Sequence, residues 1–179
     1  MASRPITSLD DLKLFLSIMT EKYGVYGHLA QVQFSWGLRF QTAAAITVGD
    51  ARRCLKFGHV DLMENKTGKL RACSVNSRVR SVFDVYVDDT RDDSELLFGK
   101  IVRETYNLKL KVVGLMLGFD VEHLSSHSLR KSFAYLLHTE FDVPVDKISQ
   151  QMNHADVKTT LIYAGIQRED KLAITRMDM

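Results

Sequence analysis

Helical periodicity runs through most of this chain and is interrupted once, and no other feature limits the fold as strongly. The segment SLDDLKLFLSIMTEK places apolar residues three and four positions apart behind Ser8, a residue type that caps helices. From Arg52 to Val75, β-branched and aromatic residues instead alternate with charged ones, and NKTGK supplies turn chemistry between two runs. The pattern predicts a mostly α-helical chain (α+β) with a small antiparallel β-sheet and Lys66 in its final hairpin.

The predicted helices follow one another without a linker rich in proline, glycine or serine. We expect helices in HLAQVQFSW and FQTAAAI before the sheet, and in SRVRSVFDVYV, ELLFGKIVRETY and LKVVGLMLG after it. Three more are predicted over residues 126–138, 144–152 and 156–163. A chain of 179 residues with 45% hydrophobic content is long enough to bury one core, so we expect a single domain, residues 1–179.

The composition excludes membrane-spanning proteins and disulfide-rich secreted proteins. The chain has no run of about 18 apolar residues, and its N-terminal segment MASRPITSLDDLK lacks the apolar stretch of a signal peptide. Cys54 and Cys73 are too few for a disulfide framework and lack the spacing of a zinc site. We therefore expect a cytoplasmic protein with no membrane partner and no metal site.

The net charge of +2, which is 24 Lys and Arg minus 22 Asp and Glu, conceals an uneven distribution. Residues 51–80 hold eight basic residues against only Asp61 and Glu64. Such a local excess of positive charge is typical of a surface that binds a polyanion. The acidic run that follows, residues 84–95, fits a solvated face of an ordinary globular protein.

Two short motifs near the C-terminus suggest phosphate chemistry. In SSHSLRKSF, a cap at Ser125 or Ser126 would put His127 and Arg130 in the first helical turn, where free backbone amides also favour an anion. Taken alone, this pair is equally expected on the surface of a capped amphipathic helix. In MNHADVKTTLIYAG, a left-handed turn at the asparagine would end one helix and present His154, nine residues before Tyr163.

These two motifs in this order resemble the C-terminal catalytic motifs of the tyrosine recombinases, the phage integrase family. GLRFQTAAAITVGD resembles the family's first-arginine stretch, with Arg39 opening a helix and Asp50 eleven positions later at a strand. NKTGKLRACSV resembles its hairpin and would make Lys66 the catalytic lysine. The resemblance covers roughly residues 27–165 and implies the family's DNA breaking-rejoining catalytic fold. It departs from the usual motifs at Lys131 and Asn153 and in lacking a separate N-terminal core-binding domain.

The resemblance also implies how the phosphodiester would be held. Attack on phosphorus adds negative charge to the nonbridging oxygens, and guanidinium groups are always protonated and fork-shaped. Arg39 and Arg130 would bind these oxygens, and His154 would donate a further hydrogen bond.

The remaining implied groups would move protons and form the covalent bond. Tyr163 would attack phosphorus and leave a 3′-phosphotyrosyl link with a free 5′-hydroxyl. His127 would take the phenolic proton as general base, and Lys66 on the hairpin would protonate the departing oxygen as general acid. One phosphodiester is exchanged for another, so we expect no ATP, metal or other cofactor.

The implied partners are double-stranded DNA recombination sites. We expect a homo-tetramer on paired sites, a monomer when free, accessory DNA-bending proteins, and a nucleoid-associated cytoplasmic location in a bacterium, phage or mobile element. The tail, residues 166–179, could be exchanged between protomers. The DNA-contacting residues are expected to be basic, namely Arg52, Arg53, Lys69, Arg71 and Lys131.

Two other functions remain open from the sequence. A type IB topoisomerase has a similar catalytic set and would relax DNA as a monomer without exchanging strands. A non-catalytic DNA-binding regulator would keep the fold without turnover, although the arginines, the lysine and the tyrosine are all present.

Overall fold

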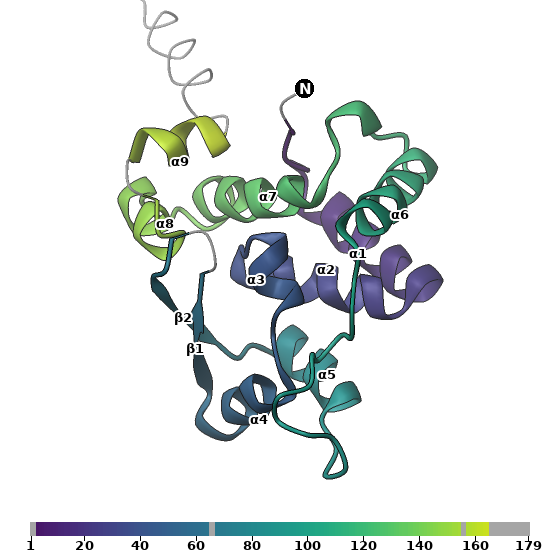
Figure 1. Ribbon diagram of the computed structural model, residues 1–179. Coiled ribbons are helices and arrows are strands. Elements are labelled where there is room, and N and C mark those ends of the chain that lie inside the picture. Colours follow the sequence, from purple (N-terminus) through teal and green to yellow (C-terminus); the bar gives the residue numbers. More distant parts are fainter. Residues whose placement is uncertain (1–2, 65–66, 155–156, 165–179) are drawn as a thin grey trace, which may run out of the picture.

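The computed structural model describes residues 3–64, 67–154 and 157–164, with the side chains of 162–164 outside that description. The elements before the sheet are α1 (Leu9–Tyr23), α2 (Val25–Trp36), α3 (Phe40–Ala44) and α4 (Val48–Phe57). The sheet is formed by β1 (His59–Met63) and β2 (Leu70–Ser74). After it come α5 (Ser77–Tyr86), α6 (Arg103–Met116), the 3-10 turn η1 (Val121–His123), α7 (Ser126–Thr139), α8 (Val145–Gln151) and α9 (Val157–Ala164) (Figure 1). The predicted fold, mostly helical with a small antiparallel sheet, is confirmed.

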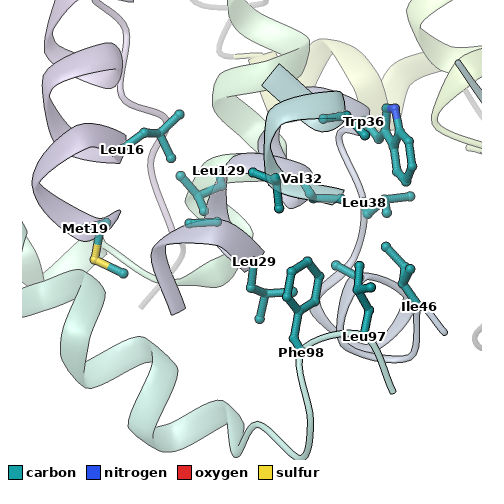
Figure 2. Packing of buried hydrophobic residues seen from close by; sticks show 14 of the residues in the cluster. Leu16, Met19, Leu29, Val32, Trp36, Leu38, Ile46, Leu97, Phe98 and Leu129 are labelled. Atoms are coloured by element: carbon teal, nitrogen blue, oxygen red, sulfur yellow. The ribbon is translucent and has the colours of Figure 1, made fainter. Parts of the chain in front are cut away.

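Helix α2 lies at the centre of the molecule and packs against α1, α3, α5 and α7. Figure 2 shows Leu16 and Met19 of α1 gathered with Leu29 and Val32 of α2 and Leu129 of α7. All five side chains are buried, and each fully buried aliphatic side chain contributes about 1.5–3 kcal/mol to folding. The site described below is built on the C-terminal end of this buried helix.

One buried amide connects α2 to the start of α7. The Gln33 side chain donates to the carbonyls of Leu38 at 3.2 Å and Ser126 at 3.0 Å. Its oxygen accepts a hydrogen bond from the Tyr106 hydroxyl of α6 at 2.8 Å. A fully satisfied buried network of this kind fixes the relative positions of its elements. The segment after α2 and the first turn of α7 are therefore held close together.

The two strands pair antiparallel with His59 opposite Ser74 and Met63 opposite Leu70. Two helices bond to the main chain of β2: Trp36 of α2 donates to the Ser74 carbonyl at 2.8 Å, and Gln151 of α8 donates to the Ala72 carbonyl at 3.3 Å. In Figure 1 the start of β2 accordingly lies beside α8. The turn between the strands includes Lys66, which lies outside the described residues.

Two expectations about secondary structure were wrong. Residues 52–57, which we expected in the sheet, belong to α4, because Thr47 and Asp50 form a capping box and Ala51 and Cys54 bury one helical face. Asp50 is therefore in the first turn of a helix rather than at a strand.

The second error concerns residues 95–116, where we expected two helices. Residues 95–102 are irregular, and a single helix, α6, begins at Arg103. Leu96 forms a bridge with Thr47, and the Leu97 amide donates to the Ile46 carbonyl at 2.8 Å. These bonds to a distant segment replace helical ones.

No helix among the described residues is long and apolar enough to cross a bilayer.

Candidate active site

The C-terminal end of α2 attracts two arginine side chains. Gly37 ends the helix in the left-handed conformation, with φ 58°, and a Cβ there would lie 2.3 Å from a ring carbon of Phe133. The Gly37 carbonyl accepts from Arg130 at 2.7 Å, and the Trp36 carbonyl accepts from Arg71. Carbonyl groups at a helix C-terminus carry partial negative charge and favour cations. The carbonyl groups at the C-terminal end of α2 therefore bind guanidinium groups favourably.

Arg130 is the principal buried cation of the site. Ser125 caps α7 as expected, and its hydroxyl accepts from the His127 amide at 3.3 Å. Arg130, one turn later, has no exposed surface and also donates to the Met152 carbonyl at 2.7 Å. His127 is exposed. The two residues thus do not form the surface pair that their spacing suggested, because Arg130 turns inward towards carbonyl partners.

Arg39, the N-cap residue of α3, reaches the same centre from the other side. Its guanidinium lies 2.5 Å from the Glu64 carboxylate, which is fully buried, and its own side chain is 17% exposed. Glu64 also lies 3.5 Å from both Arg71 and Arg130. Burial acts to raise the pKa of Glu64, but Arg130, Arg39 and Arg71 outweigh it, and the pKa is lowered. The carboxylate therefore stays charged among three guanidinium groups.

His154 completes the cluster from the turn after α8. Asn153 adopts the predicted left-handed conformation, with φ 51°. The next residue, His154, lies with Nε2 3.3 Å from the Arg130 guanidinium and Nδ1 2.8 Å from the Thr160 hydroxyl. Burial first, and then the charges of Arg130 and Arg39, lower its pKa to about 4. The ring is neutral at pH 7, and because a guanidinium only donates, its proton is assigned to Nδ1.

Two side chains of the cluster, Arg39 and His154, border one open pocket of about 370 Å³. Helix α9 contributes Thr159 to its wall, and Tyr163 lies four residues further along the same helix. The Tyr163 side chain is outside the described part of the structure. The pocket is lined by Arg39, Phe40, Gln41, Arg103, Ser126, His127, His154 and Thr159.

The residues expected to contact DNA fall into different environments. Lys69 and Arg53 are exposed, Arg53 being paired with Asp50 at 2.6 Å. Arg52 is bound to Asp93 and to main-chain carbonyls of the acidic segment. Lys131 donates to the Ser3 carbonyl at 2.6 Å, which ties it to the N-terminal segment.

The expectation for Arg71 was wrong. Its residue surface is only 3% exposed, because its guanidinium satisfies the carbonyls of Trp36 and Gly37 and lies beside Glu64. Burial also lowers the pKa of Arg71. It is a structural cation beneath the site.

Sequence reasoning missed Glu64 and Arg103. The strand alternation could have revealed Glu64, because Val60 and Leu62 are buried on the same face four and two residues earlier. Arg103 is exposed at the pocket and stacks over Phe40 at 5.5 Å from the ring centre. No pattern in the sequence distinguishes it from other surface arginines.

Comparison with known proteins agrees with this geometry. The model of the phage integrase family matches residues 8–170. Tyrosine recombinase XerD of Rickettsia bellii (strain RML369-C) is 27% identical over 184 residues, which cover 90% of this chain and 60% of XerD. The chain therefore spans about 60% of the length of this relative.

Solved structures show the same fold. XerA recombinase aligns with a TM-score of 0.73 at 17% identity, over 99% of this chain and 66% of that chain. XerH site-specific recombinase, in a post-cleavage complex with palindromic difH substrate, aligns with a TM-score of 0.73 at 19% identity, over 97% and 53%. The family match over most of the chain, together with this fold, leads to one conclusion: the chain belongs to the phage integrase family.

Proposed function

We propose that this chain is the catalytic part of a site-specific DNA recombinase that cleaves and rejoins DNA through Tyr163. The observation that carries the proposal is the convergence of three side chains from distant segments. Arg39 and His154 line one pocket next to the helix that contains the tyrosine, and buried Arg130 contacts His154 directly beneath it. The cluster presents positive charge and hydrogen-bond donors at one point, which suits the charge that develops on a phosphodiester during attack.

Each described residue has a chemical role that its environment supports. Arg39 is partly exposed at the pocket and is suited to direct contact with a nonbridging oxygen. Arg130 lies behind it, where low solvent access strengthens its electrostatic effect. His127 lines the pocket and is the proposed general base. Tyr163 as nucleophile and Lys66 as general acid complete the proposal.

The same proposal includes the partners. The related XerH was solved bound to a DNA substrate, and double-stranded recombination sites are the proposed ligand here. We propose assembly of four copies on two such sites, with exchange of residues 166–179 between neighbours and help from DNA-bending proteins on nucleoid DNA. Exposed Lys69, Arg53 and Arg103 are the proposed contacts to backbone phosphates.

Covalent trapping tests this function. The protein is incubated with fragmented genomic DNA of its source, denatured, and the DNA that remains attached is sequenced. We expect adducts on Tyr163 at a few defined sites with free 5′-hydroxyl ends. Tyr163→Phe lacks only the hydroxyl, so it should lose the adducts and retain DNA binding.

Three results would contradict the proposal. Adducts that persist in Tyr163→Phe would assign the nucleophile elsewhere. Relaxation of supercoiled plasmids at many unrelated sequences, without joining of two DNAs, would instead indicate a topoisomerase. DNA binding without any adduct would indicate a regulator.

A further inference from the structure

Glu64 connects the three arginines of the buried cluster, Arg39, Arg71 and Arg130. Its Oε2 lies 2.5 Å from Arg39, and its Oε1 lies 3.5 Å from Arg71 and from Arg130. The Thr67 hydroxyl also donates to Oε2 at 3.2 Å. The carboxylate has no exposed surface. These arginines come from the start of α3, from β2 and from α7, so one side chain fixes three separate elements.

The main chain of Glu64 closes the turn between the strands. Its carbonyl accepts from the amides of Thr67 at 3.1 Å and Gly68 at 2.8 Å, and its own amide donates to the Lys69 carbonyl at 2.9 Å. Residues 64–69 include the proposed general acid. The side chain of Glu64 thus faces the arginines while its backbone anchors the turn, and a displacement of one changes the other.

The charge balance suits a phosphate ligand. Three guanidinium charges minus one carboxylate charge leave +2 at the centre. Without the carboxylate, three like charges would face one another with little solvent to screen them, and Arg39 would lose its nearest partner. A buried carboxylate that is fully paired can therefore hold the arginines in place before a ligand arrives.

We propose that Glu64 is a positioning residue for strand cleavage: it holds Arg39 and Arg130 in the orientation that receives the phosphate. The inference rests on the proposed function. A positioning role for Glu64 differs from a purely structural role in a measurable way. Neutralising the Glu64 carboxylate would raise the charge of the arginine cluster from +2 to +3. Phosphate binding should then persist while the arginines lose their fixed geometry.

The experiment compares Glu64→Gln with Glu64→Asp and with Asp61→Asn. Asp61 lies on the exposed side of β1, so its variant removes one negative charge from the same strand outside the site. DNA affinity and the single-turnover rate of adduct formation are measured separately on a trapped site. We expect Glu64→Gln to bind at least as tightly as the original chain and to cleave about 10- to 100-fold more slowly. Glu64→Asp should recover part of the rate, and Asp61→Asn should match the original chain.

A second readout does not depend on activity. The guanidinium proton resonances of Arg39 and Arg130 are followed by NMR, with and without inorganic phosphate. In the original chain we expect resolved, slowly exchanging signals, which should broaden in Glu64→Gln while phosphate still binds. If the original chain forms no adduct, the proposed function fails and these spectra alone decide the role of Glu64. Identical spectra in the two proteins, or a Glu64→Gln variant that cleaves at the full rate, would overturn the inference.

Discussion

At the scale of single residues, the site depends on side chains that are buried although they are charged. Arg130, Arg71 and Glu64 are each at most 3% exposed. Isolated charges of this kind would be expensive to bury, and they are tolerated here because each has several partners of opposite charge or carbonyl groups. The sequence motifs predicted Arg39, Arg130 and His154 as site residues. The charge distribution alone, however, leads to the expectation that charged side chains lie in solvent. That is why Glu64 was not predicted and why Arg71 was assigned to the surface.

The neutral His154 leads to a prediction about pH. Its pKa is about 4 in the folded chain and 6.5 in an unfolded one, so the unfolded state binds more protons between these values. The free energy of unfolding should be fully retained above pH 6.5 and should fall as the pH drops towards 4. Urea titrations across this range measure the effect, and His154→Gln should reduce the slope. His28→Gln is the comparison variant, because burial also lowers the pKa of His28. An unchanged slope in His154→Gln would contradict the prediction.

At the scale of helices and strands, the sequence predicted elements whose capping and periodicity are local. Ser8 and Ser125 cap α1 and α7 as expected, and Asn153 ends α8. The segments that failed depend on distant partners. Residues 95–102 lose helical structure because the Leu97 amide bonds to the Ile46 carbonyl and Leu96 forms a bridge with Thr47. No window of local sequence contains that information.

Alanine substitutions at two glycines that end helices distinguish the cost of backbone strain from the cost of a steric clash. Gly37 and Gly58 end α2 and α4 with φ 58° and 81°. A Cβ added at Gly37 would lie 2.3 Å from the ring of Phe133, whereas one added at Gly58 would meet nothing within 4 Å. Gly58→Ala should cost about 1 kcal/mol, the usual penalty of a left-handed alanine. Gly37→Ala should cost clearly more and should also slow cleavage, since the Gly37 carbonyl holds Arg130. Urea denaturation of both variants measures the difference. Equal losses would show that the packing against Phe133 does not matter.

At the scale of the whole molecule, the positive charges divide into an inner and an outer set. Lys69 is exposed, whereas Arg71, two residues along the chain, is buried. Lys69→Ala should weaken binding to any DNA and reduce the dependence of log K on log salt by about one. Arg71→Ala should instead lower the free energy of unfolding. Anisotropy of a labelled duplex at several salt concentrations, with urea denaturation, separates the two. A folded Arg71→Ala variant with the salt response of Lys69→Ala would refute the division.

The positions of the Arg130 partners in the sequence also determine when the site can form during synthesis of the chain. The partners lie 93 residues before Arg130, at Gly37, and 22 residues after it, at Met152. A ribosome adds residues in order, so a nascent chain that has already produced Arg39, the hairpin and α7 still lacks the carbonyl and the histidine that complete the cluster. Under the proposed function, the chemistry that breaks DNA becomes available only after residues 152–163 have been synthesised, so a translation product that stops before Tyr163 has no nucleophile with which to cleave DNA.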